Sequence, residues 1–438
     1  MSRARPTAIV PALTMYSLLG PTLLALASLG GDSWPDFRGP RADGHAPGAD
    51  LPLEWNEELN VTWKTAIHGR GWSTPVVQDG LAWMTTADDQ GHALGVVCVD
   101  IERGAVRHDL RLFEVETPQE RKALNSYASP SPVIEAGRAY VHFGAEGTAC
   151  IDTQTAKVVW RRRDLRCEHL VGPGSSPILY GERLIFHVDG ADVQYVIALD
   201  KRSGETVWRT ERSVDFEGVA PDLRKAFSTP ILINHGGREQ LISTGANASM
   251  AYDPRDGREL WKVVFSGFSQ SSRPIAVEGM VFLNTGFMKP ELWAVKTDGT
   301  GDVTSSHVAW KRRRAVPTMA SPLLTDGRLF FVSDGGVVSC LAADSGEELW
   351  RERIGGEHSA SPLLAAGRLY FFDRTGQTTV IEPTDHLQVL ARNQLADGFM
   401  ASPAVIGDAL LLRTKTHLYR IEDAREETSE PARKPSRD

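Results

Sequence analysis

The residue types that most often carry metal or nucleophilic chemistry are scattered in this chain of 438 residues, which contains 12 His and 4 Cys. No His-x-x-x-His, Cys-x-x-Cys or EF-hand spacing occurs, and no serine has the surroundings of a nucleophile elbow. Residues 298–302 could form a cation loop and residues 172–176 a phosphate cradle, but both segments are more typical of solvated turns. These spacings therefore predict no catalytic residue and no metal site.

The charge of the chain excludes one class of partner. Its formal net charge is −8 at pH 7, so it lacks the basic excess of a nucleic-acid-binding protein, and we predict no nucleic-acid partner. Two basic runs, residues 161–163 and 311–314, are exceptions. We interpret them as solvated loop charge, with an anion-facing patch as the alternative.

The first thirty residues have the pattern of a secretory signal peptide. Arg3 and Arg5 precede a largely apolar run over residues 8–29, and Ala25 and Ala27 match a small-residue cleavage site. Two prolines interrupt the run, which disfavours the alternative of a retained membrane helix. No Cys stands near the cleavage site, so no lipid attachment is expected. We expect a periplasmic or secreted mature protein without a transmembrane span.

A short signature of Ser or Thr, Pro and apolar residues recurs along nearly the whole remaining chain. Its prolines are Pro75, Pro132, Pro177, Pro230, Pro274, Pro322, Pro362 and Pro403. In the fifth copy an arginine stands between the serine and the proline, as Ser272-Arg273-Pro274. The copies are separated by 40–57 residues, a spacing that indicates a repeat architecture. Pro suits the first residue of a strand, where it has no ladder hydrogen bond to donate.

Each copy has the pattern of four short strands. Two apolar runs around a Gly turn, as in residues 323–331, predict a hairpin. A third run ends near an Asp, and a fourth run ends in Trp after a second Gly turn, as in residues 198–208. Repeated radially, such units predict an all-β, eight-bladed β-propeller of four-stranded antiparallel blades. The closing tryptophans, which should pack between blades, are Trp63, Trp160, Trp208, Trp261, Trp310 and Trp350.

The unit Leu199-Asp200-x-x-Ser203-Gly204-x-x-x-Trp208 resembles the repeat of pyrroloquinoline-quinone (PQQ)-like propellers, and the resemblance covers about residues 56–422. That superfamily contains the quinoprotein dehydrogenases and the BamB-type outer-membrane assembly lipoproteins. Many of its members carry no cofactor. The resemblance therefore implies the fold and leaves the function open.

The cysteines are expected to serve packing rather than redox chemistry. Cys98, Cys150 and Cys340 occupy one repeat position, where other blades have Ala, and equivalent positions in different blades are too far apart for a disulfide. Cys167 stands alone in a loop. The resemblance implies two adjacent cysteines beneath the cofactor of a quinoprotein alcohol dehydrogenase, and this sequence has no Cys-Cys pair.

Propellers bind ligands at the mouth of the central channel, where loops enter the innermost strands, and residues 112–127 and 212–227 are the longest such loops. For each residue of this ring, ligand binding and local packing are both open. Arg273 and His358 are the foremost candidates for contact with an anion or a quinone. The predicted ligand-binding ring comprises Trp72, Asn125, Tyr127, Phe227, Gln270, Arg273, Met319, His358 and Phe399.

The favoured function is a non-catalytic binding or assembly scaffold without a cofactor, whose partner is another extracytoplasmic or envelope protein. The missing Cys pair and the lack of a recognisable calcium set favour it. The alternative is a PQQ-dependent oxidoreductase of the quinoprotein alcohol or sugar dehydrogenase type with Ca²⁺, for which Asn125 and Asp222 are available. A third class is the binding of carbohydrate or another small ligand.

The closure of the ring has its own prediction. The outer-strand motif Val61-Thr62-Trp63-Lys64 precedes the first unit, whereas only three strands follow Pro403. We expect the N-terminal strand to complete the last blade, with Trp63 against residues 418–421, because this leaves no sheet edge exposed. The expected divisions are a signal peptide (1–27), an irregular arm (28–55), the propeller (56–422) and a disordered tail (423–438).

Overall fold

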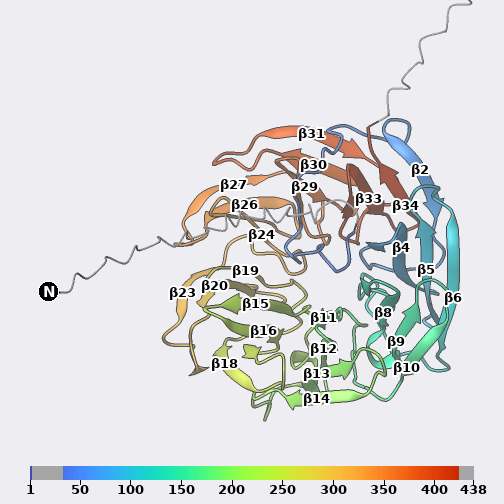
Figure 1. The fold of residues 1–438 in the computed structure, drawn as a ribbon. Coiled ribbons are helices and arrows are strands. Elements are labelled where there is room, and N and C mark those ends of the chain that lie inside the picture. Colours follow the sequence, from blue (N-terminus) through green and yellow to red (C-terminus); the bar gives the residue numbers. More distant parts are fainter. Residues whose placement is uncertain (2–32, 424–438) are drawn as a thin grey trace, which may run out of the picture.

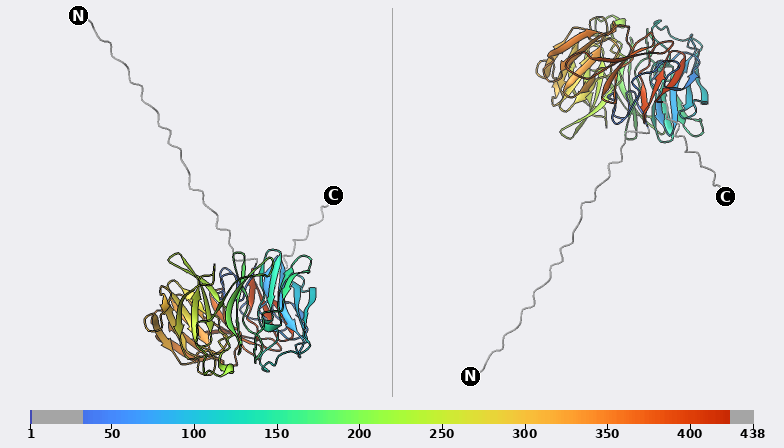
Figure 2. Two further views of the ribbon diagram at one scale, coloured as in Figure 1. Left: turned by 90° about the horizontal axis from the view of Figure 1, so that it is seen from below. Right: turned by 90° about the horizontal axis from the view of Figure 1, so that it is seen from above.

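The protein, whose computed structural model describes Met1 and residues 33–423, forms eight β-sheets placed radially around a central channel (Figure 1). Seen from the side, the sheets make a flat disc (Figure 2). The predicted eight-bladed all-β propeller is confirmed. The described residues include two short 3₁₀ helices, η1 (Gly144–Glu146) and η2 (Pro221–Leu223), and none of their helices is long and apolar enough to cross a membrane. The expected signal peptide beyond Met1 and residues 424–438 of the expected tail lie outside the described residues.

The strands of the first four blades follow one another in the chain from the innermost strand outward. They are β3 (Val76–Gln78), β4 (Leu81–Ala87), β5 (Ala93–Asp100) and β6 (Val106–Glu114); β7 (Val133–Glu135), β8 (Arg138–His142), β9 (Thr148–Asp152) and β10 (Val158–Arg162); β11 (Ile178–Tyr180), β12 (Arg183–Asp189), β13 (Gln194–Asp200) and β14 (Thr206–Glu211); and β15 (Ile231–His235), β16 (Arg238–Gly245), β17 (Ala248–Tyr252) and β18 (Glu259–Val264), with β22 (Gly301–Asp302) added in parallel to β18.

The last four blades have the same order from the innermost strand outward. They are β19 (Ile275–Val277), β20 (Met280–Asn284), β21 (Leu292–Lys296) and β23 (Val308–Arg312); β24 (Leu323–Thr325), β25 (Arg328–Val332), β26 (Val337–Ala342) and β27 (Glu348–Arg353); β28 (Leu363–Ala365), β29 (Arg368–Phe372), β30 (Gln377–Ile381) and β31 (Val389–Gln394); and β32 (Ala404–Ile406), β33 (Ala409–Arg413), β34 (His417–Ile421) and β2 (Val61–Ala66).

The ring closes as predicted, because β2 is the outer strand of the last blade. In this antiparallel pair Trp63 is opposite Arg420, and Thr65 is opposite Leu418. The first and last strands of the propeller therefore share one sheet, and each of the eight blades has its four strands.

The closing tryptophans join neighbouring blades through the glycine turns of the repeat. Trp160 Nε1 donates to Lys201 O of the next blade at 3.0 Å, and a Cβ on Gly204 would lie 2.7 Å from the Trp160 ring. Only glycine permits this approach, which explains why Gly and Trp recur together. The same contact joins Trp63 to Gly104, Trp208 to Gly257 and Trp310 to Gly346. Two tryptophans differ: Trp350 donates to Thr384 O in a turn without glycine, and the indole of Trp261 donates to Gln240 of its own blade.

Among the described residues, the hydroxyl before six of the eight prolines also joins blades, whereas the Thr74 hydroxyl has no partner. A backbone N–H at the start of one innermost strand is buried and needs an acceptor, which the Ser or Thr hydroxyl of the next blade supplies. These bonds, 2.9–3.0 Å long, run from Thr74 to Ser131, from Ser131 to Ser176, from Ser176 to Thr229, from Arg273 to Ser321, from Ser321 to Ser361 and from Ser361 to Ser402. The fifth copy has Arg273 at this position, so no hydroxyl continues the series from Thr229.

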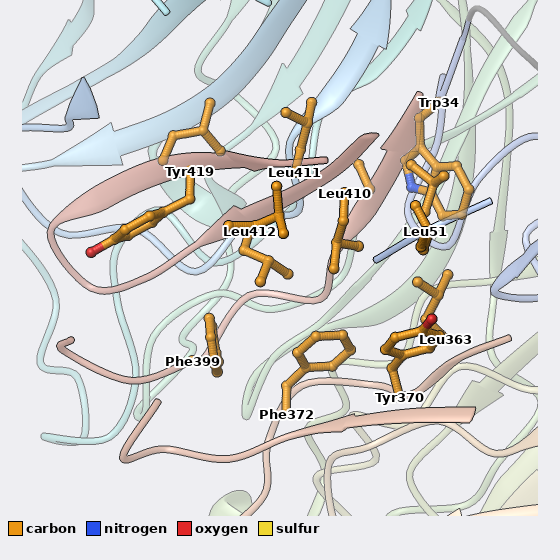
Figure 3. Close-up of a cluster of buried hydrophobic side chains, with 14 of the residues drawn as sticks. Trp34, Leu51, Leu363, Tyr370, Phe372, Phe399, Leu410, Leu411, Leu412 and Tyr419 are labelled. Atoms are coloured by element: carbon orange, nitrogen blue, oxygen red, sulfur yellow. The ribbon is translucent and has the colours of Figure 1, made fainter. Parts of the chain in front are cut away.

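The segment before β2 is mostly turns and bends, yet its apolar side chains belong to the core. Its short strand β1 (His45–Ala46) pairs in parallel with β28. Trp34 and Leu51 are 2% and 1% exposed. In Figure 3 they lie beside Leu363, Tyr370 and Leu410, which come from the last two blades. Burial of these side chains by the hydrophobic effect holds the segment on the propeller.

Candidate functional site

The antiparallel strand order places two sets of loops on one face of the ring, which we call the mouth face. One set leads into the innermost strands, and the other joins the second and third strands of each blade. All nine residues of the predicted ligand-binding ring lie in the first set. The structure thus brings them to one face, but most of their side chains bond or pack within the chain itself.

Residues 34–46 lie in the central channel against the innermost strands. Trp34 exchanges two backbone hydrogen bonds with Val77 of β3, each 2.8 Å long. Pro35 O accepts the N–H of Ile134 of β7 at 2.9 Å, and Gly44 O accepts the N–H of Leu364 of β28 at 2.9 Å. We call residues 34–46 the channel segment. Backbone hydrogen bonds join it to three blades.

Arg273, a foremost candidate for ligand contact, is bound by the channel segment. Its side chain is 2% exposed, and its Nη2 donates to Asp36 Oδ2 at 3.1 Å and to Pro230 O at 3.0 Å. Its Nη1 donates to Phe37 O. Burial raises the pKa of Asp36, and the positive charge of Arg273 opposes this rise. The anion beside Arg273 is therefore a carboxylate of the same chain.

A second buried arginine fastens the channel segment to the sixth blade. Arg38 is 2% exposed, and its Nη2 donates to Asp43 O at 2.7 Å and to Pro322 O at 2.9 Å. Burial lowers the pKa of Arg38 to about 9. Both arginines therefore act as buried donors to backbone carbonyls inside the channel.

His358, the other foremost candidate, is also engaged by backbone. It is 1% exposed. Its Nδ1 lies 2.9 Å from Phe372 O and its Nε2 lies 3.0 Å from Gly355 O. Burial lowers the pKa of His358, while the two carbonyls oppose that change. Neither ring nitrogen is available to a ligand in this arrangement.

Three further ring residues contact neighbouring loops and strands, and a fourth is half-buried. Gln270 Nε2 donates to Thr285 O at 3.0 Å, and Gln270 O accepts the N–H of Phe227 at 2.7 Å. Phe399 is buried and lies edge-on to Phe372, with the ring centroids 5.6 Å apart. Met319, which has no polar group to offer, is half-buried before β24.

Asn125 and Tyr127 brace the long loop before β7. Asn125 Nδ2 donates to Val171 O at 2.9 Å, and its Oδ1 accepts the Ser129 hydroxyl at 2.6 Å. The Tyr127 hydroxyl donates to Gln119 O at 2.7 Å. Tyr127 thus holds the loop's own backbone, and Asn125 also joins this loop to the loop before β11.

Trp72 lines a cavity of about 420 Å³ on the mouth face, which we call the Trp72 pocket. Its indole Nε1 donates to Leu124 O at 3.0 Å, and the Arg70 guanidinium lies 4.9 Å from the ring centroid. The lining brings together loops of the first, second, seventh and eighth blades. The pocket is lined by Gly69, Arg70, Trp72, Asp89, Ala123, Leu124, Arg374, Met400 and Lys415.

A second cavity, of about 510 Å³, lies at the outer edge between β6 and β10 and is lined in part by Arg161 and Arg163. Arg161 Nη1 donates to Leu112 O at 3.1 Å, and Arg163 is 3.9 Å from Glu146. In the other basic run, Arg313 pairs with Glu291 at 2.6 Å. Contacts within the chain therefore engage much of the charge in both basic runs.

The described residues do not fit a quinone held with Ca²⁺. A Ca²⁺ site needs several converging oxygen ligands, and no three His, Cys, Asp or Glu side chains within residues 33–423 are grouped to hold a metal. Asn125 is engaged by Val171 O of the loop before β11 and by the Ser129 hydroxyl. The carboxylate of Asp222 is 64% exposed and pairs with Lys225. These two residues lack the arrangement that the oxidoreductase alternative needs.

The cysteines are free and buried, as the repeat position predicted for Cys98, Cys150 and Cys340. Burial raises the pKa of each of these three thiols to about 12. Cys167 Sγ lies 3.5 Å from His169 Nε2, which accepts the N–H of Ala145 at 2.8 Å. Burial raises the pKa of Cys167 and lowers that of His169 to about 4, so the pair is neutral and is not an activated nucleophile.

The sequence motifs did not predict the cations of the Trp72 pocket or the polar residues of the channel segment. Arg374 and Lys415 lie in loops between second and third strands, whereas the predicted ring drew only on loops entering innermost strands. Asp36 and Arg38 lie outside the repeats. The signal available for them was the dense run of aromatic, Arg, Pro and Gly residues over 34–44, which is unusual for an irregular linker.

Comparisons with known proteins agree with the architecture. The family model for "Outer membrane protein assembly factor BamB" matches residues 55–163, 192–321 and 291–389. No curated protein matches the chain. Similar solved structures include BamB from Moraxella catarrhalis, with 14% identity, a TM-score of 0.59, and coverage of 83% of this chain and 100% of that one. A europium-containing methanol dehydrogenase has 11% identity, a TM-score of 0.62, and coverage of 88% and 90%. At these identities the likeness shows the fold alone.

Proposed function

The chain belongs to the family of the outer membrane protein assembly factor BamB, and we propose that it is a non-catalytic binding scaffold that acts outside the cytoplasm. Its partner is another extracytoplasmic or envelope protein, and it needs no cofactor. The signal-peptide pattern of the first residues and the family both support this location.

The proposal rests on the engagement of Arg273, His358 and the other polar residues of the predicted ring by the chain itself. Arg273 pairs with Asp36, and both ring nitrogens of His358 face backbone carbonyls. A cofactor site needs such groups to converge on a shared cavity. Here they instead stabilise the channel segment and the loops, so a partner is left with the exposed groups of the mouth-face loops.

The mouth-face loops present exposed apolar side chains suited to contact with a protein. Phe287 and Met288, in the loop between β20 and β21, are 52% and 73% exposed. Leu124, Leu170 and Leu223, in loops that lead into innermost strands, are also exposed. Aromatic residues and Met are enriched at protein interfaces, and exposed apolar clusters often mark interaction sites.

Titration with PQQ tests the proposal that the protein is non-catalytic and needs no cofactor. Purified protein is mixed with PQQ, with and without Ca²⁺, and then supplied with alcohols or sugars and an artificial electron acceptor. We expect neither stoichiometric binding nor substrate-dependent dye reduction, because the residues present do not polarise a quinone through a metal. Micromolar stoichiometric binding with dye reduction would replace the scaffold by the oxidoreductase alternative.

Photo-crosslinking in cells tests the proposal that a partner protein binds the mouth face. A benzophenone amino acid at position 288 samples the mouth face, and the same group at position 154, in the turn between β9 and β10, samples the opposite face. We expect discrete protein adducts from position 288 that position 154 does not give. Identical adduct patterns from both positions, or none from position 288, would contradict a partner on the mouth face.

A further inference from the structure

The Trp72 pocket carries a positive charge that contrasts with the charge of the whole molecule. Its lining contains Arg70, Arg374 and Lys415 against one carboxylate, Asp89. The chain as a whole has a formal charge of −8. An electropositive hollow on an acidic protein attracts anionic groups selectively.

The cations of this pocket keep donors that the protein does not use. Arg70 Nη2 donates to Ala123 O, but its buried Nε has no partner among the described residues. Burial lowers the pKa of Arg70, and the nearby Arg121 lowers it further, so an anion beside it would be stabilising. A buried unpaired donor costs free energy that a ligand can recover.

Arg374 and Lys415 are likewise only partly engaged. Arg374 donates through Nε to the Ser359 hydroxyl at 2.7 Å and through Nη1 to Glu357 at 3.2 Å, which leaves Nη2 without a partner within residues 33–423. Lys415 Nζ donates to Arg374 O at 3.1 Å, and its other hydrogens are not engaged by described residues. These two cations sit beside each other on loops of the seventh and eighth blades.

The remaining lining indicates which anion fits. Trp72, Leu124 and Met400 give the pocket apolar walls, which suit the methylene groups of a glutamate side chain better than a fully hydrated phosphate. Asp89 would repel a dianionic phosphate, whereas it can accept a peptide N–H. Arg374 can donate a charge-assisted hydrogen bond to a carboxylate oxygen through Nη2, the group of its guanidinium that described residues leave unused. The volume, about 420 Å³, lies in the range of small ligand sites.

We propose that the Trp72 pocket binds carboxylate side chains of an acidic segment of the partner polypeptide. This inference rests on the proposed scaffold function and assigns it a docking point. Phe287 and Met288 lie in a loop of the fifth blade, whereas loops of the first, second, seventh and eighth blades form the pocket, so these two side chains and the pocket are separate contacts on one face.

A binding assay with matched variants tests the proposal. The probe is a fluorescein-labelled octapeptide with four glutamates, compared with the same peptide carrying glutamines, and anisotropy is measured at low and at physiological salt. Lys415→Gln removes one pocket cation, and Arg374→Lys keeps the charge but removes the planar fork. Lys157→Gln is the control, because Lys157 is exposed in the turn between β9 and β10 on the opposite face and the charge change is identical.

We expect the glutamate peptide to bind and the glutamine peptide to bind at least tenfold more weakly. Lys415→Gln and Arg374→Lys should each weaken binding about threefold, as for a partly exposed charge pair, while Lys157→Gln leaves it unchanged. Equal affinities for the two peptides, or equal losses in Lys415→Gln and Lys157→Gln, would overturn the proposal. Glutarate competing as well as the peptide would also overturn it, since a small dicarboxylate would then be the ligand.

Failure of the pocket assignment can be told from failure of the scaffold function. If the peptide does not bind but adducts at position 288 persist, only the pocket assignment is wrong. Dye reduction with PQQ would instead remove the proposed function, whatever the peptide does.

Discussion

The buried pair of Arg273 and Asp36 gives the sharpest test of how the channel segment is held. In Arg273→Ala, Asp36 loses its counter-charge at 3.1 Å, and Pro230 O and Phe37 O lose their donor. Arg273 is 2% exposed and Asp36 is 17% exposed, so water replaces these contacts poorly. Removing one partner of a buried ion pair costs about 3–5 kcal/mol. We expect this loss in the free energy of unfolding at pH 7.5.

The pH dependence of that loss follows from the pKa of Asp36. Burial raises this pKa in the folded protein, so the protonated form favours folding. Its contribution is fully present below the unfolded pKa of about 3.9 and is lost as the pH rises through the folded value. Without Arg273 the folded pKa rises further, because the attraction that lowers it is gone. The penalty should therefore be smaller at pH 5 than at pH 7.5.

Urea unfolding followed by tryptophan fluorescence at the two pH values measures both effects. Asp36→Asn in the Arg273→Ala background removes the unpaired charge and should abolish the extra pH dependence. Arg202→Ala is the control, because Arg202 is 79% exposed in its pair with Glu182, and it should cost less than about 1 kcal/mol. A loss below about 1 kcal/mol for Arg273→Ala at pH 7.5, or the same loss at both pH values, would refute the reasoning.

Two further predictions concern other buried groups. Ser131→Ala removes the hydroxyl that accepts the Thr74 N–H at 2.9 Å, and it should lower the free energy of unfolding in urea by about 1–3 kcal/mol. The control Ser305→Ala, at an exposed position, should lower it by less than about 0.5 kcal/mol. Equal losses would contradict a role for the inter-blade bond. No cysteine of the native protein should react with Ellman's reagent at pH 8, whereas all 4 should react after unfolding. The reason is that the cysteines are buried and burial raises the pKa of each thiol. Rapid reaction of the native protein would show that one of them is accessible.

The sequence by itself determined the propeller, because its repeated residues both form the turns within one blade and contact the neighbouring blade. Gly204 both permits its turn and receives the Trp160 ring, so the spacing of Gly and Trp encodes the packing of one blade on the next. The outer-strand motif around Trp63 had no partner in its own unit, and the last unit lacked one strand, so closure followed from counting.

Only the tertiary structure decided what the mouth residues do. The orientation of the Arg273 and His358 side chains depends on the residues packed beside them. Asp36 lies more than two hundred residues from Arg273 in the chain, in a segment without any repeat that would predict its place. The Trp72 pocket joins Arg70, just before the first blade, to Arg374 and Lys415 of the last two blades, which lie beside the first blade only when the ring closes. Short-range patterns specify strands and turns, whereas a site built from distant loops exists only after the long-range contacts have formed.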